Sequence, residues 1–350
     1  MRILGISAFY HDAAAALVVD GELVAAAQEE RFSRRKHDPA FPAAAARWCL
    51  DDAETRLEDL DAVVLYEKPL LAFERLLETW HATAPAGLAQ FLRSAPAWMG
   101  RKLFFRTALA RGLRGLDRGD PARVPVLFGE HHLSHAASAF YPSPFPEAAV
   151  LTLDGVGEWA TASIAHGRGR ELRTLRELRF PHSLGLFYSA VTQFLGFRVN
   201  SGEYKVMGLA PYGDPEGERT ARFEAFVRER LLALGDDGAL RLNAAFFRFT
   251  TGLEMIHRRR WSALFGFPAR SPDGPLEGHH ADLALAVQRV TEDVVLRLAA
   301  EARRLTGARH LCLAGGVALN CVANARLRDA GLFEGIWVQP AAGDAGGAAG

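Results

Sequence analysis

The chain contains 350 residues, of which 49% are hydrophobic and 23% are charged, and its 41 Lys and Arg residues balance 41 Asp and Glu residues. This composition is typical of a globular protein with a sizeable core, and the balanced charge excludes a strongly basic surface for nucleic acid or anionic lipid. A chain of 350 residues also exceeds what one compact core usually serves, so we expect two domains or lobes.

Cysteine usage and hydropathy predict a cytoplasmic protein. The three cysteines, Cys49, Cys312 and Cys321, are odd in number and far apart, which disfavours a disulfide framework and a paired-cysteine metal site. Residues 2–8 are apolar but too few for a signal peptide, and no uninterrupted apolar run reaches membrane length. We therefore expect neither a membrane nor a nucleic acid among the partners.

The first half of the chain predicts three strands in quick succession, followed by alternating helices and strands. Asp20 and Gly21 form a two-residue hairpin signal between the second and third strands. Short apolar runs indicate the strands, and Ala-rich or longer periodic stretches indicate the helices. The expected elements are strands at 2–7, 13–20 and 22–28, a helix at 41–50, a strand at 62–66, a helical region at about 69–110, a strand at 124–128 and a helix at 129–140.

The second half repeats this order. Its expected elements are strands at 148–154, 158–165 and 171–178, helices from 183 and at 282–305, a strand at 310–314, a helix at 317–330 and a strand at 335–338. Repetition of a whole lobe predicts an α/β protein with two β-β-β-α-β-α-β lobes around a cleft, at 1–145 and 146–350. A mixed helical and loop insertion is expected at about 213–275, and its basic run at 258–260 is interpreted as a solvated face.

Three histidines open the helix at 129–140. His131 and His135 stand four residues apart, so both imidazoles lie on one helix face and could reach a single metal ion, whereas His132 points elsewhere. The alternative is a polar helix start whose histidines bond nearby carbonyls. Asp154 and Asp344 are expected at strand ends of the second lobe, facing these histidines across the cleft. Two imidazoles with one or two carboxylates suit iron, manganese or zinc, although Asp154 could instead only cap a turn.

Glycine-rich turns are candidate phosphate sites. The turn after the first strand of each lobe carries small and polar residues, and backbone amides there could grip a polyphosphate from both sides, although a plain hairpin is the alternative. Two strand-to-helix junctions, at 315–320 and 339–347, could present amides to a nucleotide. The candidate nucleotide-binding residues are Asp12, Asp154, Gly155, Gly157, Gly315, Gly316, Asn320 and Gly343.

Together these motifs, with the segments 5–17, 28–38 and 202–213, resemble the O-carbamoyltransferases of antibiotic and nodulation-factor biosynthesis along the whole chain. The resemblance implies a duplicated actin-like ATPase fold of the ribonuclease H-like type. It also implies that two different domains carry out the two steps of the reaction. A separate carboxyl-terminal domain makes carbamoyl-adenylate from carbamoyl phosphate and ATP, and the duplicated domain transfers the carbamoyl group to a hydroxyl on the acceptor.

The resemblance further implies roles for single residues. His131, His135, Asp154 and Asp344 correspond to ligands of Fe(II) or another divalent transition metal, and Gly316 and Asn320 to adenylate contacts. His11 and Lys36 match positions near the carbamoyl group, where His11 could accept the hydroxyl proton and Lys36 could stabilise negative charge on the departing AMP. The alternatives are that His11 bonds within its own turn and that Lys36 is a solvated member of a basic run.

The sequence stops at Gly350 within a glycine-rich turn, so we expect the activating domain to be absent from this chain. Either the chain is a fragment of a longer protein or the partner domain lies on another polypeptide. The chain should then bind carbamoyl-adenylate without making it, and the acceptor should be a hydroxylated small molecule or oligosaccharide. Two other functions stay open: an actin-like kinase or nucleotide hydrolase, and a truncated, non-catalytic nucleotide-binding domain.

Overall fold

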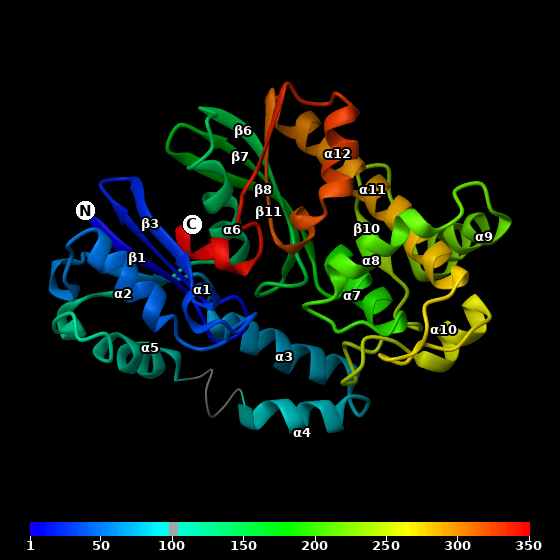
Figure 1. The fold of residues 1–350 in the computed structure, drawn as a ribbon, viewed down its shortest axis with the longest axis horizontal. Coiled ribbons are helices and arrows are strands. Elements are labelled where there is room, and N and C mark those ends of the chain that lie inside the picture. Colours follow the sequence, from blue (N-terminus) through cyan, green and yellow to red (C-terminus); the bar gives the residue numbers. More distant parts are fainter. Residues whose placement is uncertain (98–103) are drawn as a thin grey trace.

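Two five-stranded mixed sheets form the framework of the computed structural model, which describes residues 1–97 and 104–350 (Figure 1). The first sheet has the order β3-β2-β1-β4-β5 and the second has the order β12-β11-β6-β7-β8. In both, the first three strands in the chain pair antiparallel and the last two pair parallel. The strands are β1 (Arg2–Ser7), β2 (Ala14–Val19), β3 (Glu22–Gln28), β4 (Ala62–Leu65), β5 (Val126–Phe128), β6 (Glu147–Leu153), β7 (Ala160–Arg168), β8 (Glu171–Arg179), β11 (His310–Ala314) and β12 (Gly335–Val338).

The shared strand order confirms the predicted duplication, and this arrangement of two like lobes is the actin-like ATPase fold. Residues 4–7 of β1 and 14–17 of β2 are buried at consecutive positions, so both faces of these central strands are covered and nearly all of these residues are apolar or small. The sequence therefore favoured strands there without any clear alternation of apolar and polar residues.

The first lobe carries the helices α1 (Glu30–Ser33), α2 (Ala43–Asp52), α3 (Pro69–Thr83), α4 (Leu88–Ala97) and α5 (Phe105–Arg114). The helical region predicted at 69–110 is thus divided into segments, and its residues 98–103 lie outside the described residues. Pro85 and Gly87 separate α3 from α4, and the φ angle of +87° at Gly87 does not belong to a right-handed helix. These two residues are the local reason for the interruption.

The second lobe carries a larger helical layer, which covers one face of its sheet (Figure 1). The 213–275 insertion packs into the same core through Phe223, Trp261 and Phe265, and the rings of Trp261 and Phe265 contact that of Phe194. Residues 258–260 are exposed, as predicted for a solvated face. The remaining elements are α7 (Leu184–Phe194), α8 (Glu203–Leu209), α9 (Glu218–Phe226), β9 (Leu232–Leu234), β10 (Leu240–Leu242), α10 (Arg258–Phe265), α11 (Gly278–Thr306) and α12 (Cys321–Asp329).

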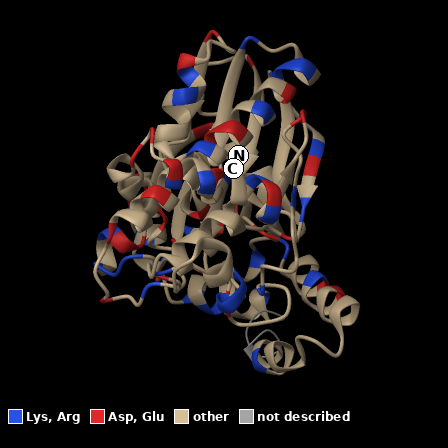
Figure 2. Cartoon of the chain, turned by 90° about the vertical axis from the view of Figure 1, so that its right-hand side faces the viewer, with Lys and Arg blue, Asp and Glu red and all other residues tan. Residues whose placement is uncertain are grey.

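The positions of Lys and Arg residues alternate with those of Asp and Glu residues along the helices and strands (Figure 2). This distribution agrees with the balanced composition of the chain. Among the described residues, no helix has the length and apolar character needed to cross a membrane.

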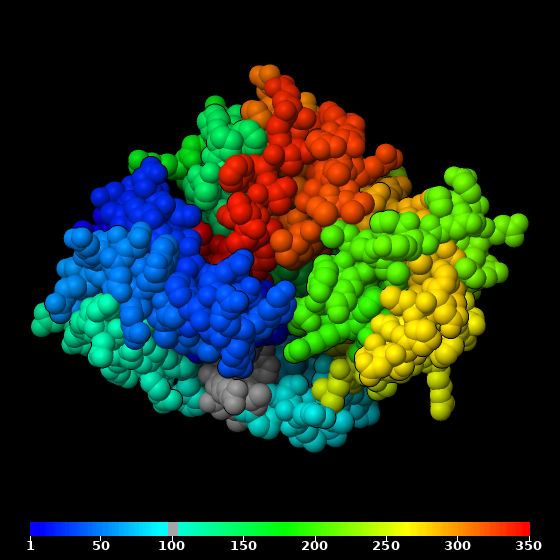
Figure 3. Space-filling view, viewed as in Figure 1, coloured from blue at the N-terminus to red at the C-terminus, as the bar shows by residue number. Residues whose placement is uncertain are grey.

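The ends of the two lobes pack on each other's sheets. Helix α6 (His131–Phe140) follows β5 of the first lobe, but Ala136, Ala139 and Phe140 pack against β6, β7 and β11 of the second. The 3₁₀ turn η7 (Asp344–Ala349) follows β12 of the second lobe, but its alanines pack against β2 of the first. In the space-filling view the carboxyl-terminal segment accordingly lies between the lobes (Figure 3). The lobe boundary predicted at residue 145 assigns helix α6 to the first lobe, but the helix packs on the sheet of the second lobe.

Candidate active site and metal centre

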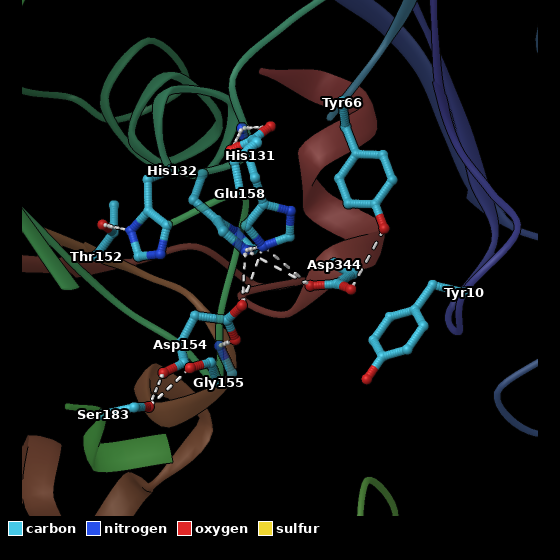
Figure 4. Close-up of polar contacts among 12 residues, drawn as sticks. Tyr10, Tyr66, His131, His132, Thr152, Asp154, Gly155, Glu158, Ser183 and Asp344 are labelled. Atoms are coloured by element: carbon cyan, nitrogen blue, oxygen red, sulfur yellow. Dashed lines mark hydrogen bonds and ion pairs between the residues drawn. The ribbon is translucent and has the colours of Figure 1, made fainter. Parts of the chain in front are cut away.

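The four predicted metal ligands converge between the lobes (Figure 4). His131 and His135 lie one turn apart on α6, Asp154 follows β6, and Asp344 begins η7. The Nε2 atom of His131 lies 3.0 Å from Oδ2 of Asp154 and 3.1 Å from Nε2 of His135. One oxygen of Asp344, Oδ1, lies 3.6 Å from each of these two Nε2 atoms. The helical spacing predicted from the sequence thus places both imidazoles on one face, as expected.

These distances fit a bound divalent transition metal. Ligands at about 2.0–2.2 Å from one ion stand roughly 3.0–3.5 Å from each other in tetrahedral or octahedral geometry. One donor atom from each of the four residues lies within 4.8 Å of every other, and both histidines and Asp344 are buried. Two imidazole nitrogens and two carboxylates suit iron, manganese or zinc better than magnesium, which prefers oxygen ligands and water.

The electrostatics of the cluster follow from burial and close charges. Burial alone lowers the pKa of His131, but the Asp154 hydrogen bond and the charge of Asp344 raise it to about 10. Burial raises the pKa of Asp154, yet the hydrogen bond and charge of His131 hold it well below its usual range. A divalent cation would take over the charge compensation that a proton on His131 supplies in the metal-free site.

His132 has a different environment from its two neighbours. Its Nδ1 atom lies 2.6 Å from the hydroxyl of Thr152, on the side of α6 that faces the second sheet (Figure 4). Burial and the nearby charge of His131 lower the pKa of His132 to about 3, so its imidazole is neutral. His132 is therefore a packed, hydrogen-bonded side chain outside the cluster, as its position in the helix predicted.

Glu158 links the starts of two helices beside the four predicted metal ligands. Sequence reasoning did not identify it as a site residue. The backbone N–H of His131 donates a bifurcated hydrogen bond to both oxygens of the Glu158 carboxylate, at 3.1 Å each, and the backbone N–H of Lys68 donates to Oε1 at 2.7 Å. Both donors lie at helix starts, where free N–H groups favour a carboxylate. Gly157 leaves room for this arrangement, because an added Cβ would lie 2.9 Å from Cβ of His131.

Three polar side chains of the first lobe, those of His11, Asp12 and His37, form a hydrogen-bonded group next to Asp344. Oδ2 of Asp12 lies 2.9 Å from Nδ1 of His11, and Oδ1 of Asp12 lies 2.7 Å from Nδ1 of His37. The other nitrogen of His11 faces Asp344 at 3.7 Å. Burial lowers the pKa of His11, but the Asp12 bond and the charge of Asp344 raise it to about 9. His11 thus bonds within its own turn and also reaches the edge of the metal cluster.

The neighbouring residues Lys36 and His37 have different environments: His37 contacts Asp12, whereas Lys36 is exposed. Sequence reasoning did not select His37, although its bond to Asp12 makes Asp12 a bridge between two imidazoles. Lys36 was selected, yet its side chain is exposed and forms no hydrogen bond or ion pair with the described part of the chain. The role of Lys36 near the carbamoyl group stays a prediction.

The predicted nucleotide turns lie beside the cluster. The backbone N–H of Gly316 donates to Oδ1 of Asp154 at 3.0 Å, so this junction contacts a metal ligand directly. Gly315 has φ +91°, and an added Cβ would lie 2.2 Å from the carbonyl oxygen of Leu153, so only glycine fits the turn. Gly343 is open, since an added Cβ would have its nearest neighbour at 3.8 Å, in Leu319.

The other nucleotide candidates have structural partners. The carbonyl of Gly155 accepts a 2.7 Å hydrogen bond from Ser183, and the N–H of Gly157 donates to the carbonyl of Ala160 at 2.9 Å. Asn320 begins α12 and exchanges hydrogen bonds of 2.9 and 3.1 Å with Gln288. The side-chain amide of Asn320 is therefore already satisfied within the protein, and an adenylate contact through that amide would replace one of these bonds.

The duplicated sheets define the class of proteins that share the actin-like ATPase fold, and the imidazoles and carboxylates gathered between the lobes form a candidate metal centre. Within that class, the chain belongs to the carbamoyltransferase amino-terminal family, because the family model described as "Carbamoyltransferase N-terminus" matches residues 2–350.

Relatives and solved structures place the chain in context. An uncharacterized protein of Synechocystis sp. is 55% identical over 100% of this chain and 56% of its own length. Nodulation protein NolNO of Sinorhizobium fredii is 37% identical over 97% of this chain and 45% of its own length. The chain thus spans about half the length of these relatives. The crystal structure of HypF from T. kodakarensis is 14% identical with a TM-score of 0.44, covering 99% of this chain and 47% of that one.

Proposed function

We propose that this chain transfers a carbamoyl group from carbamoyl-adenylate to a hydroxyl of a small-molecule or oligosaccharide acceptor. Family membership supports carbamoyl transfer, and the observation that carries the proposal is the cluster of two imidazoles and two carboxylates beside the Gly315–Gly316 turn. The donor would be made from carbamoyl phosphate and ATP by an activating domain, which relatives about twice as long have room to contain.

His131, His135, Asp154 and Asp344 would hold a divalent transition metal, which we propose to be Fe(II). When bound, such an ion supplies Lewis acidity toward phosphate oxygens and so favours departure of AMP. The charge of Lys36 would assist by stabilising the same negative charge, while the N–H of Gly316 holds the carboxylate of Asp154 in place. The two imidazole ligands favour this function over an actin-like kinase or nucleotide hydrolase, which would use magnesium with phosphate and water ligands.

His11 would act as the general base. Because Asp12 accepts a hydrogen bond at Nδ1 of His11, the ring is held with Nε2 directed toward Asp344 and the centre. A neutral Nε2 atom can accept the proton of the attacking hydroxyl, and a cation held by Asp344 opposes protonation of His11 and so keeps Nε2 available. His37, which bonds the other oxygen of Asp12, would help to fix this orientation.

The proposal is tested with purified chain, preformed carbamoyl-adenylate and a panel of hydroxylated acceptors. We expect acceptor-dependent loss of the adenylate, and we expect His11→Gln to slow it by about 100-fold or more with the metal retained. His166→Gln is the matched control, since His166 pairs with Glu147 on the second sheet, away from the cluster. Absence of transfer with every acceptor, or equal rates for His11→Gln and wild type, would contradict the proposal.

A second assay tests whether this chain performs only the transfer step and depends on another domain to make carbamoyl-adenylate. Supplied with carbamoyl phosphate and ATP, the chain alone should release no pyrophosphate, and addition of an activating domain should restore transfer. Release of pyrophosphate by the isolated chain would show that it activates carbamoyl phosphate itself.

A further inference from the structure

A cavity separate from the metal cluster lies between the first-lobe helices α3 and α4 and the second lobe. Its volume is about 210 Å³. This is below the roughly 300–1,000 Å³ typical of sites for whole drug-sized ligands, so the cavity would take one part of a larger molecule. Its walls are mainly apolar and aromatic and include Arg75, Trp80, Phe91, Val156, Phe180 and Phe249.

Arg75 is the one charged side chain among the described residues that line this cavity. Its guanidinium lies over the ring of Phe180, with Cζ 5.2 Å from the ring centroid. The Nη1 atom is buried without a hydrogen-bond partner, and the side chain forms no hydrogen bond or ion pair with the described part of the chain. Burial lowers the pKa of Arg75 to about 10, so the group is still charged at neutral pH.

Such an arginine is costly for the fold. A buried charge without a hydrogen-bonded partner destabilises a protein, and arginines that support a fold normally pair with carboxylates or carbonyls. Arg219 illustrates the usual case, because its Nε donates to the buried carboxylate of Asp282 at 2.5 Å. A second polar donor of the cavity, Nε1 of Trp80, is likewise buried without a partner. Both of these atoms are covered, but the Arg75 side chain as a whole is half-buried, and its other guanidinium N–H groups have no partner in the described part of the chain. These accessible N–H groups are the donors that an occupant with acceptor atoms would meet.

The cavity adjoins the proposed reaction centre. Val156, in its wall, lies two residues after the metal ligand Asp154 on the same turn. Helix α3, which carries Arg75, is tied at its start to this turn through the Lys68–Glu158 hydrogen bond, and Glu158 also holds the start of α6. The negative charge of Glu158 also favours the charged form of Arg75 and so raises its pKa. A molecule seated in the cavity could therefore extend toward Asp154.

We propose that this cavity is the acceptor subsite and that it selects hydroxylated acceptors with an apolar or aromatic body bearing a carboxylate or phosphate. Arg75 binds the anionic group through its planar fork of N–H donors, and the aromatic walls bind the body. The described lining contains no carboxylate, which disfavours a polycationic acceptor. This inference rests on the proposed function, since it assumes that an acceptor hydroxyl must reach the centre.

Binding of matched small probes tests the inference without any transfer reaction. We would titrate the purified chain by calorimetry with 4-(hydroxymethyl)benzoate, 4-(hydroxymethyl)phenyl phosphate and the uncharged 4-methylbenzyl alcohol. A charge-assisted hydrogen bond lost from a buried site corresponds to an affinity about tenfold to a hundredfold lower. Wild type should therefore bind at least one anionic probe about tenfold or more tightly than the alcohol, and Arg75→Met should abolish the difference. The better anion distinguishes carboxylate from phosphate recognition.

Arg93→Met is the matched control, because Arg93 is exposed on the neighbouring helix α4 and does not line the cavity. It should leave probe binding unchanged while altering net charge equally. Arg75→Met should keep or raise the Tm, since no hydrogen bond or ion pair is lost, methionine can still pack on Phe180, and a desolvated charge is removed. Equal binding of all probes by wild type, or a lower Tm with unchanged probe affinity in Arg75→Met, would overturn the inference.

Two further results separate this inference from the proposed function. Weaker AMP binding in Arg75→Met with unchanged probe binding would assign Arg75 to the nucleotide and refute an acceptor site. A chain that discriminates the probes but transfers no carbamoyl group would refute the proposed function alone. Transfer to an anionic acceptor with the same KM in wild type and Arg75→Met would refute the acceptor subsite alone.

Discussion

Replacing His135 by alanine tests the metal centre at its most enclosed ligand. The His135 side chain is fully buried, and its Nε2 lies 3.1 Å from that of His131 and 3.6 Å from an oxygen of Asp344. The substitution leaves α6 intact, because alanine favours a helix, but it removes one of four donors and opens a cavity the size of an imidazole. We expect the variant to fold and to lose its metal.

The magnitude follows from the ligand set. Loss of an outer hydrogen-bond partner of a metal ligand typically lowers metal affinity by about 10- to 100-fold, and loss of a ligand itself should exceed that range. We therefore expect at least about a 100-fold lower affinity in His135→Ala. Wild type purified anaerobically should carry close to one iron per chain, whereas the variant should carry almost none after dialysis.

The assay is metal analysis by mass spectrometry, supported by the absorption spectrum of the cobalt-substituted protein. His132→Ala is the control, because His132 is also buried on α6 but bonds Thr152 instead of the cluster. This variant has the same truncation and a comparable loss of packing, and it should retain the metal. Wild type that binds no transition metal, or His135→Ala that keeps a full equivalent, would refute the assignment of the centre.

Three other substitutions, with Gly307→Ala as a control for the first, test the turn at Gly315 and Gly316 and the role of Lys36. Gly315→Ala should lower the free energy of unfolding by more than about 3 kcal/mol in urea titrations, because its Cβ would overlap the Leu153 carbonyl at 2.2 Å. Gly307→Ala, at φ +65° with open space, should cost only about 1–2 kcal/mol, and equal costs would refute the steric argument. Gly316→Val should weaken AMP binding by about tenfold or more in calorimetry, and unchanged affinity would make this turn merely structural. Lys36→Ala should slow transfer by about ten- to a thousandfold with metal content intact, and an unchanged rate would remove Lys36 from the mechanism.

The order of strands and helices in each lobe could be predicted because each element is indicated by residues close together in the sequence. Apolar runs, the Asp20-Gly21 hairpin turn and the repeat of the whole pattern are all visible without distances between segments. The His131 and His135 pair is local in the same sense, since helical spacing alone places the two rings on one face. The convergence of Asp154 and Asp344 on that pair could be predicted because both follow strands that meet at one edge of a sheet.

Other parts of the site depend on contacts that no periodicity encodes. His37 contacts Asp12 because the segment after β3 folds back over the turn between β1 and β2. The neighbouring side chain of Lys36 is exposed. Arg75 is one basic residue on an amphipathic helix, where solvent exposure is the ordinary expectation. Its burial against Phe180 of the other lobe emerges only from the packing of α3 across the cleft.

The crossing of α6 and η7 between lobes explains why a metal centre should sit at this place in the fold. His131 is the first residue of α6, which packs on the second sheet, and Asp344 is the first residue of η7, which packs on the first. Gly5 permits the second contact, because a Cβ there would lie 1.9 Å from the carbonyl oxygen of Ala348. The ligands are thus fixed to different sheets, while coordination tolerates only about 0.2 Å of variation in bond length. A metal held by all four residues would therefore stabilise this packing of α6 and η7, and by linkage a ligand that favours the same packing would strengthen metal binding.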